Sequence, residues 1–286
     1  MFKNICDLAA YHDSMAKSMT DKAWFLNEID WNEYRGKKLI FVDIGCADGT
    51  MGRYLMTHFM SPNSFHGVYN VDTDVYYYGF DLPEIISDKT EEFGGRIHFA
   101  PMSKLMDCLV KDIEQEQIHF IVIMSSVLHE ICSNPIDRGE LIDLRQLIKS
   151  EYCDYLAIRD MCYNGPDHAV PIRTLISMYK NCDNDVYKCE FTGALKETDR
   201  FQYKPLAKFL LTYQYTENFD TEMSEDYFSN WHDYITEILP DANSYTVLYC
   251  KNYLLPYYVQ KWREDWGLTS FEFTTHERLL YKLRNK

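Results

Sequence analysis

Acidic and glycine residues cluster near residue 45 in a pattern that suits ligand binding. Asp43 ends a short apolar run that begins at Leu39, and a helical pattern starts at Thr50. The turn between them consists of Gly45, Cys46, Ala47, Asp48 and Gly49. Glycine lets the backbone fold sharply and approach a ligand closely, and the start of the next helix offers free N–H groups. A strand, a glycine turn and a helix in this order open a doubly wound α/β sheet.

The composition of this turn excludes two common phosphate-binding motifs. A dinucleotide motif, G-x-G-x-x-G, needs a second glycine where Ala47 stands. The carboxylate of Asp48 would also oppose a pyrophosphate. A P-loop needs Gly-Lys-Ser/Thr, which does not follow the turn. The turn is therefore expected to face a different ligand.

A second acid follows further along the chain. Residues His66 to Val71 predict a short strand that ends at Asp72. An acid at the end of the second strand of such a sheet can accept hydrogen bonds from both ribose hydroxyls. The glycine turn and this acid therefore follow one another in the order that such a sheet requires. Residues 73–86, after the acid, are expected to be helical in part.

The segment Asp43 to Gly49, DIGCADG, together with Asp72, resembles motif I and the following acid of the class I S-adenosylmethionine-dependent methyltransferases. Ala47 stands where glycine is commoner in that family. The resemblance implies S-adenosyl-L-methionine as the cofactor, with its amino-acid part against the glycine turn. The expected cofactor-binding residues are Asp43, Gly45, Cys46, Ala47, Gly49, Asp72, Met102, Ser103 and Ser125. A Rossmann-like domain with a different pocket is the alternative.

The third strand is predicted at Arg96 to Ala100 and leads into Pro101-Met102-Ser103. Family members commonly carry an acidic or amide residue here, near the adenine, and this chain does not. Met102 could pack on the adenine ring. Ser103 could hydrogen-bond the ring or cap the helix expected over Lys104 to Ile113.

The fourth strand, Ile118 to Met124, is almost wholly apolar, as in a central parallel strand. Ser125 follows it, and His129 and Glu130 come shortly after. His129 could accept a proton from a substrate hydroxyl or amine, and its alternative is a packing role. Glu130 is expected to orient a group or cap a helix. His129 and Glu130 are the predicted catalytic residues.

Other methyltransferase chemistries lack their motifs in this chain. The Asp/Asn-Pro-Pro-aromatic box of amino-methylating nucleic-acid enzymes is absent after the fourth strand, and Cys132 lacks the Pro-Cys context of cytosine-C5 enzymes. Asp160 follows the fifth strand, predicted at Tyr155 to Ile158, but no Asp-Asn pair comes after it. No metal is therefore predicted.

The elements that position these residues alternate as strand and helix from Lys38 to Asp160. This alternation predicts an α/β fold with a doubly wound, mostly parallel sheet, and the resemblance implies that the sheet has seven strands. Tyr245 to Tyr249 and Thr274 to Leu283 are expected to form its terminal antiparallel hairpin. Residues 1–36 are predicted as a helical N-terminal segment, with helices around Ile5 to Met15 and over Asp21 to Ile29, and residues 37–286 are predicted as the Rossmann-like domain. A Tyr-rich, acidic insertion is expected at about 165–240.

Composition narrows the functional class. Hydrophobic residues make up 46% and charged residues 26%, which is typical of a globular protein. The net charge of -15 disfavours nucleic acid as a partner, because Lys and Arg supply most of that affinity. No apolar run approaches the ~18 residues that span a membrane, and no signal peptide is evident. Nine unpatterned cysteines and the absent signal predict a cytoplasmic protein.

These observations predict a methyltransferase that acts on an oxygen or nitrogen of a small molecule. The alternatives are a cofactor-binding regulatory or assembly protein without catalysis, or an RNA or protein methyltransferase. The sequence does not indicate the oligomeric state.

Overall fold

The computed structural model describes residues 19–60, 73–113, 118–133, 138–150, 152–196, 201–215, 219–224, 231, 235 and 245–283. The chain forms two compact units. The sheet unit comprises Ala9–Asp160, His232–Cys250 and Arg278–Lys286. The helical unit comprises Met1–Leu8, Met161–Trp231 and Lys251–Glu277. The domain boundaries expected from the sequence stay a prediction.

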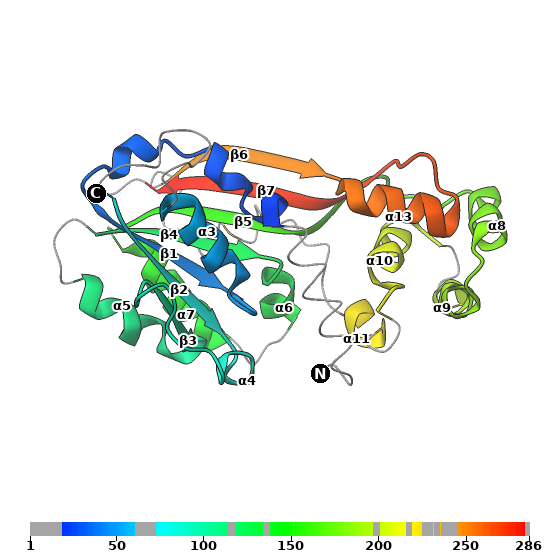
Figure 1. Ribbon diagram of the computed structural model, residues 1–286. Coiled ribbons are helices and arrows are strands. Elements are labelled where there is room, and N and C mark those ends of the chain that lie inside the picture. The colour runs from blue at the N-terminus through cyan, green and yellow to red at the C-terminus, as the bar shows by residue number, and fades with distance from the viewer. Residues whose placement is uncertain are drawn as a thin grey trace. The chain divides into compact units, whose positions relative to one another are not determined.

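A seven-stranded sheet has the order β3-β2-β1-β4-β5-β7-β6 (Figure 1). Its strands are β1 (Lys38–Ile44), β2 (Asp74–Asp81), β3 (Ile97–Pro101), β4 (Ile118–Ser125), β5 (Cys153–Asn164), β6 (Tyr245–Tyr253) and β7 (Thr274–Leu283). The pairs β1–β2, β1–β4, β2–β3 and β4–β5 are parallel. An antiparallel hairpin ends the sheet. The predicted fold class is confirmed.

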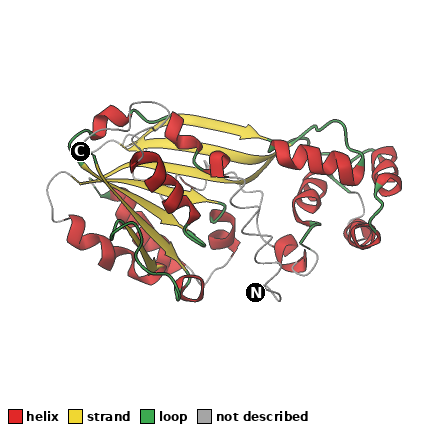
Figure 2. Ribbon diagram, in the orientation of Figure 1, coloured by secondary structure: helices red, strands yellow, loops and turns green. Residues whose placement is uncertain are grey.

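Helices cover both faces of the sheet unit (Figure 2). They are α2 (Met19–Lys22), α3 (Thr50–Met60), α4 (Pro83–Ile86), α5 (Leu105–Ile113), α6 (Leu128–Ser133) and α7 (Arg138–Lys149). Leu39 to Val42 of β1 are fully buried, as expected for a strand covered on both sides. Because side chains alternate along a strand, Leu39 and Phe41 share one face and Ile40 and Val42 the other.

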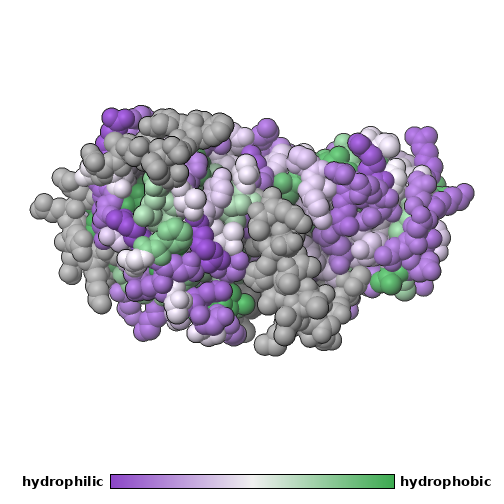
Figure 3. Space-filling view, viewed as in Figure 1, coloured by the Kyte–Doolittle hydropathy of each residue, from purple (hydrophilic) through white to green (hydrophobic). Residues whose placement is uncertain are grey.

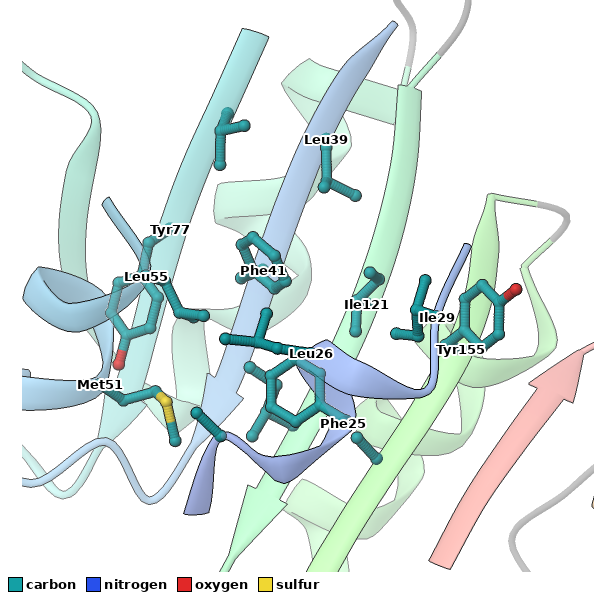
Figure 4. Close-up of a cluster of buried hydrophobic side chains, with 14 of the residues drawn as sticks. Phe25, Leu26, Ile29, Leu39, Phe41, Met51, Leu55, Tyr77, Ile121 and Tyr155 are labelled. Carbon is teal, nitrogen blue, oxygen red and sulfur yellow. The ribbon is translucent and has the colours of Figure 1, made fainter. Parts of the chain in front are cut away.

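The N-terminal segment packs on the face that carries Leu39 and Phe41 (Figure 4). After α2 it forms two 3-10 helices, Trp24–Asn27 and Trp31–Tyr34, instead of one helix over Asp21 to Ile29. Asp30 begins the second by accepting a hydrogen bond from the Asn32 backbone N–H at 3.1 Å. The helix expected around Ile5 to Met15 lies outside the described residues. The described part of this segment belongs to the core of the sheet unit.

The second strand corrects the sequence prediction. Residues 73–86 were expected to be helical in part, but β2 occupies Asp74–Asp81. Val75 and Tyr77 are buried in the alternation of a strand, and β2 pairs with β1 from Lys38↔Asp74 to Ile44↔Phe80. Aromatic and β-branched side chains fit the pleated, half-buried surface of a sheet, which explains the preference for strand. The strand predicted at 66–71 lies outside the described residues.

The helical unit has an aromatic core of its own. Its helices are α8 (Ile172–Asn181), α9 (Asp185–Lys196), α10 (Tyr203–Thr212), α11 (Phe219–Ser224) and α13 (Pro256–Trp266). Trp266 lies 5.2 Å from Phe191 and 5.3 Å from Tyr213 between ring centroids. Trp262 donates its indole N–H to the Leu210 carbonyl at 2.7 Å. The described part of the Tyr-rich segment therefore folds around tryptophans from a later helix.

Hydrophilic side chains cover most of the coloured surface in Figure 3, in keeping with the charged composition. No helix in the described ranges is long and apolar enough to cross a membrane.

We expect Phe25→Ala to lower the free energy of unfolding by about 3–5 kcal/mol, because Phe25 is fully buried and the substitution leaves a cavity. Asn27→Ala, an exposed position on the same 3-10 helix, is the matched control and should cost little. Denaturant unfolding of both variants measures the difference. A loss below about 1 kcal/mol for Phe25→Ala would contradict a core role for this segment.

Candidate functional site

The predicted glycine turn has a left-handed backbone at three positions. Gly45, Ala47 and Gly49 have φ angles of 72°, 48° and 78°. The backbone N–H groups of Gly45 and Cys46 both donate to the Phe80 carbonyl, at 2.8 and 3.1 Å. Because glycine adopts positive φ without strain, two of the three positions suit their residue, and Ala47 is the exception.

Two glycines of the turn also meet close neighbours. A Cβ atom on Gly45 would lie 2.5 Å from Val127 Cγ2, and one on Gly49 would lie 2.5 Å from the Phe99 ring. The turn is therefore wedged between a side chain that follows β4 and a side chain of β3. Any larger residue at either glycine would force the turn away from these neighbours.

Asp81 closes β2 beside this turn. Its Oδ2 accepts the Ala47 backbone N–H at 2.7 Å, and its Oδ1 accepts the Leu82 backbone N–H at 2.7 Å. Burial raises the pKa of Asp81, while these two N–H groups lower it. A carboxylate has about four lone-pair positions, so Asp81 retains capacity for a ligand.

The second strand ends at a different acid from the one that the sequence predicted. Asp72 lies outside the described residues, and in the sequence it precedes β2 instead of ending it. The acid at the carboxyl end of the second strand is Asp81. A signal for it was present in the sequence, since Val75 to Phe80 is a run of strand-forming residues followed by an acid.

Asp43 is the residue before the last of β1, and its carboxyl is buried. Its Oδ2 accepts the Tyr77 hydroxyl at 2.5 Å. Burial raises the pKa of Asp43 to about 7, although the Tyr77 bond and the charge of Lys22 lower it and Asp81 raises it further. Asp43 therefore titrates near neutral pH beside the turn.

Cys46 points toward β2. A Cβ atom on Gly79 would lie 2.8 Å from the Cys46 sulfur, so the thiol packs on this glycine. Burial and the carboxylates of Asp43 and Asp81 raise the pKa of the Cys46 thiol. Because the thiolate is the reactive form, Cys46 acts as a small packing residue.

The loop after β4 is organised by Asp160 of β5. Its Oδ2 accepts the backbone N–H groups of Val127 and Leu128 at 3.1 and 2.7 Å. Ser126 has a φ of 59°. Ser125 is buried, and its hydroxyl has no hydrogen-bond partner among the described residues. A buried polar atom of this kind is often completed by a ligand or water.

His129 is tied to the same carboxylate. Its Nδ1 lies 2.7 Å from Asp160 Oδ1, and the side chain is only 4% exposed. Glu130 is largely exposed, with an oxygen 3.9 Å from His129 Nε2. The Asp160 contact fixes the orientation of the imidazole ring through Nδ1. The sequence analysis placed Asp160 after the fifth strand but did not identify it as the partner of His129.

The two residues expected near an adenine follow β3. Met102 is buried in the 3-10 helix Met102–Lys104, and Ser103 is exposed within the same helix. Pro101 occupies the N-cap position of that helix, and no side chain caps it. No three His, Cys, Asp or Glu side chains among the described residues gather as a potential metal site.

The described residues combine three features: this strand order, an antiparallel hairpin at one end of the sheet, and a glycine turn after β1. The described strands form the mostly parallel, seven-stranded α/β sheet that the resemblance implies. No family model matches the sequence, and no curated protein matches it either.

Solved methyltransferase structures resemble the chain at low sequence identity. A SAM-dependent methyltransferase from Anabaena variabilis has a TM-score of 0.43 at 13% identity, covering 99% of this chain and 96% of that chain. The plantazolicin methyltransferase BpumL, in complex with SAH, has a TM-score of 0.42 at 11% identity, covering 94% of this chain and 84% of that one.

Asp43 should make stability fall as pH rises toward neutrality. Its pKa of 3.8 in the unfolded chain becomes about 7 in the folded protein, so between these values the folded state binds more protons. The stabilisation is present below pH 4 and is lost as pH rises through 7. We expect the unfolding free energy of the wild type, relative to Asp43→Asn, to fall by up to roughly 1.4 kcal/mol per pH unit.

Denaturant unfolding of both proteins from pH 4 to 8 measures this difference. Asp88→Asn, at an exposed position, serves as the control. A wild-type-to-variant difference that is constant across the range, or that grows with pH, would contradict the raised pKa.

Proposed function

We propose that the protein is an S-adenosylmethionine-dependent methyltransferase that acts on an oxygen or nitrogen of a small molecule. The observation that carries this proposal is the wedged turn from Gly45 to Gly49, with Asp81 beside it and the His129–Asp160 pair following β4. In open α/β sheets, ligands bind beyond the carboxyl ends of the strands. The glycine turn, Asp81 and the loop that carries His129 lie at the ends of β1, β2 and β4.

The residues present fit the proposed cofactor. The close turn permits an extended ligand to lie against backbone atoms, and the unpartnered Ser125 hydroxyl offers a hydrogen bond to a bound group. The spare lone pairs of Asp81 suit a pair of ribose hydroxyls, which are donors. The bound cofactor would supply an electrophilic methyl group on a sulfonium sulfur.

His129 would remove the proton that an attacking hydroxyl or amine must lose. Asp160 holds Nδ1, so the proton would arrive at Nε2. The Asp160 carboxylate would then stabilise the imidazolium that forms, as in other His–carboxylate pairs. The Glu130 carboxylate, which lies near Nε2, would favour the protonated form of the ring.

The net charge of the protein supports a small molecule as the substrate. A net charge of -15 disfavours a polyanionic substrate. The second candidate function, a cofactor-binding protein without transfer activity, is favoured by the burial of His129, since a base must be reached by its substrate.

Asp81→Asn should weaken S-adenosylhomocysteine binding at least tenfold. The substitution removes the charge from hydrogen bonds that are worth about 1.5–3 kcal/mol each. Asp72→Asn is the matched control and should bind as the wild type does. Isothermal titration calorimetry measures all three proteins, and thermal melting checks that each is folded. Loss of affinity in Asp72→Asn alone would restore the acid named from the sequence. No heat from the wild type with either sulfur cofactor would refute the proposed function.

His129→Ala should lower turnover by roughly 10²–10⁴, the usual effect of removing a positioned proton acceptor. The affinity for S-adenosylhomocysteine should stay nearly the same. The assay uses a methyl acceptor found by screening hydroxyl and amine compounds with methyl-labelled cofactor, normalised to folded protein. The acidic limb of the rate–pH profile should disappear in the variant. Wild-type turnover with an unchanged profile would remove His129 from the mechanism and leave positioning of the acceptor as its basis.

A further inference from the structure

A pocket of about 500 Å³ lies at the end of the sheet opposite the glycine turn. Lys37, which precedes β1, lines it together with His119 near the start of β4 and Asp154 near the start of β5. The glycine turn follows the other end of β1, roughly 25 Å away along the strand at a rise of ~3.3 Å per residue. The volume suits a small molecule, and every lining residue belongs to the sheet unit. The pocket is therefore separate from the candidate cofactor site.

A carboxylate holds the imidazole of His119 at this pocket. Its Nδ1 lies 2.6 Å from Asp154 Oδ2, and the Tyr34 hydroxyl donates to the same oxygen at 3.0 Å. Burial raises the pKa of Tyr34, and the charge of Asp154 raises it further, so the hydroxyl stays protonated as a donor. The Tyr34 ring meets the imidazole edge to face, with centroids 5.5 Å apart. The ring of His119 is therefore fixed from two sides.

Two polar groups of the lining have capacity for a ligand. Lys282 does not stand alone, because its Nζ lies 2.8 and 2.9 Å from the two carboxylate oxygens of Glu33. Lys37 also lines the pocket, and no other described residue forms an ion pair with it. No described residue shares a hydrogen bond with Nε2 of His119. The Lys37 ammonium and this ring nitrogen can therefore both engage a bound group.

The chemistry of these groups suits a carboxylate. An ammonium is a donor only, and an imidazolium can donate to Asp154 from Nδ1 and to a ligand from Nε2 at the same time. A carboxylate has two oxygens, one for each donor. A dianion such as a phosphate ester would meet the like charges of Glu33 and Asp154, which also line the pocket. The side chain of Leu283 supplies an apolar contact for the carbon part of a ligand.

We propose that this pocket is a second ligand site that binds a small organic monocarboxylate, with the carboxylate between the Lys37 ammonium and Nε2 of His119. The tie from Asp154 to Nδ1 holds the imidazole in place for this contact. The site lies at the amino ends of β1, β4 and β5, whereas the proposed cofactor site lies beyond their carboxyl ends. The inference therefore goes beyond the proposed function and does not depend on it.

An NMR titration tests the proposal through the ring signals of isotope-labelled histidine, at about pH 6, where imidazoles are substantially protonated. Loss of one signal in His119→Gln identifies the signal of His119. The probes are propionate, hexanoate and benzoate as monocarboxylates, benzamide as the neutral match of benzoate, and phenyl phosphate as a dianion. Lys37→Met removes the ammonium but keeps an unbranched side chain. Lys104→Met, at an exposed position outside the pocket, is the matched control.

We expect at least one of the three monocarboxylates to shift the His119 signal to saturation, with a dissociation constant of about 1 mM or below. Lys37→Met should weaken binding of that probe about tenfold or more, because a charge-assisted hydrogen bond is lost. Lys104→Met should bind it within about threefold of the wild type. Benzamide and phenyl phosphate should each bind about tenfold more weakly than the best monocarboxylate.

Failure of all three monocarboxylates to saturate the His119 signal would overturn the proposal. Equal affinity in Lys37→Met and the wild type would overturn it as well, and so would benzamide or phenyl phosphate binding as tightly as the best monocarboxylate. Thermal melting verifies that each variant is folded. If Lys37→Met does not fold, the comparison of the probes on the wild type decides. The titration contains no cofactor, so its result stays separate from that of the proposed function.

Discussion

The site depends on two positions where no Cβ atom can be present. Gly45 lies against Val127 and Gly49 lies against Phe99, so the turn after β1 is in contact with elements on both sides. Close-packed interiors transmit such contacts, and a methyl group at either glycine would displace the neighbours. This wedge brings the loop after β4 and strand β3 to the same turn.

Buried polar contacts then fix the groups around the wedge. The Asp160 carboxylate accepts two backbone N–H groups of the loop and contacts the ring of His129, so a single side chain positions both the loop and the predicted base. Asp43 and Tyr77 form a second buried pair at the end of β1. Burying a polar group costs free energy unless the group has a hydrogen-bond partner. These two networks therefore hold the strand ends around the glycine turn in one arrangement.

The sequence predicted most of the sheet, because long apolar runs such as Ile118 to Met124 have one simple interpretation. It predicted a strand before Asp72, which lies outside the described residues, and it did not predict the strand that ends at Asp81. Pairing with β1 makes the run before Asp81 a strand, and pairing is a tertiary contact that periodicity does not contain. The same reason hid the Asp21–Arg159 and Asp21–Arg278 pairs, whose partners are 138 and 257 residues apart. The role of Asp72 stays a prediction.

A crystal structure of the protein with S-adenosylhomocysteine tests the account most directly. The account predicts the amino-acid part against the turn from Gly45 to Gly49 and both ribose hydroxyls on the Asp81 carboxylate. The sulfur of the ligand should face the loop after β4, which carries His129. A ligand bound away from this turn, or a ribose held by an acid other than Asp81, would contradict it.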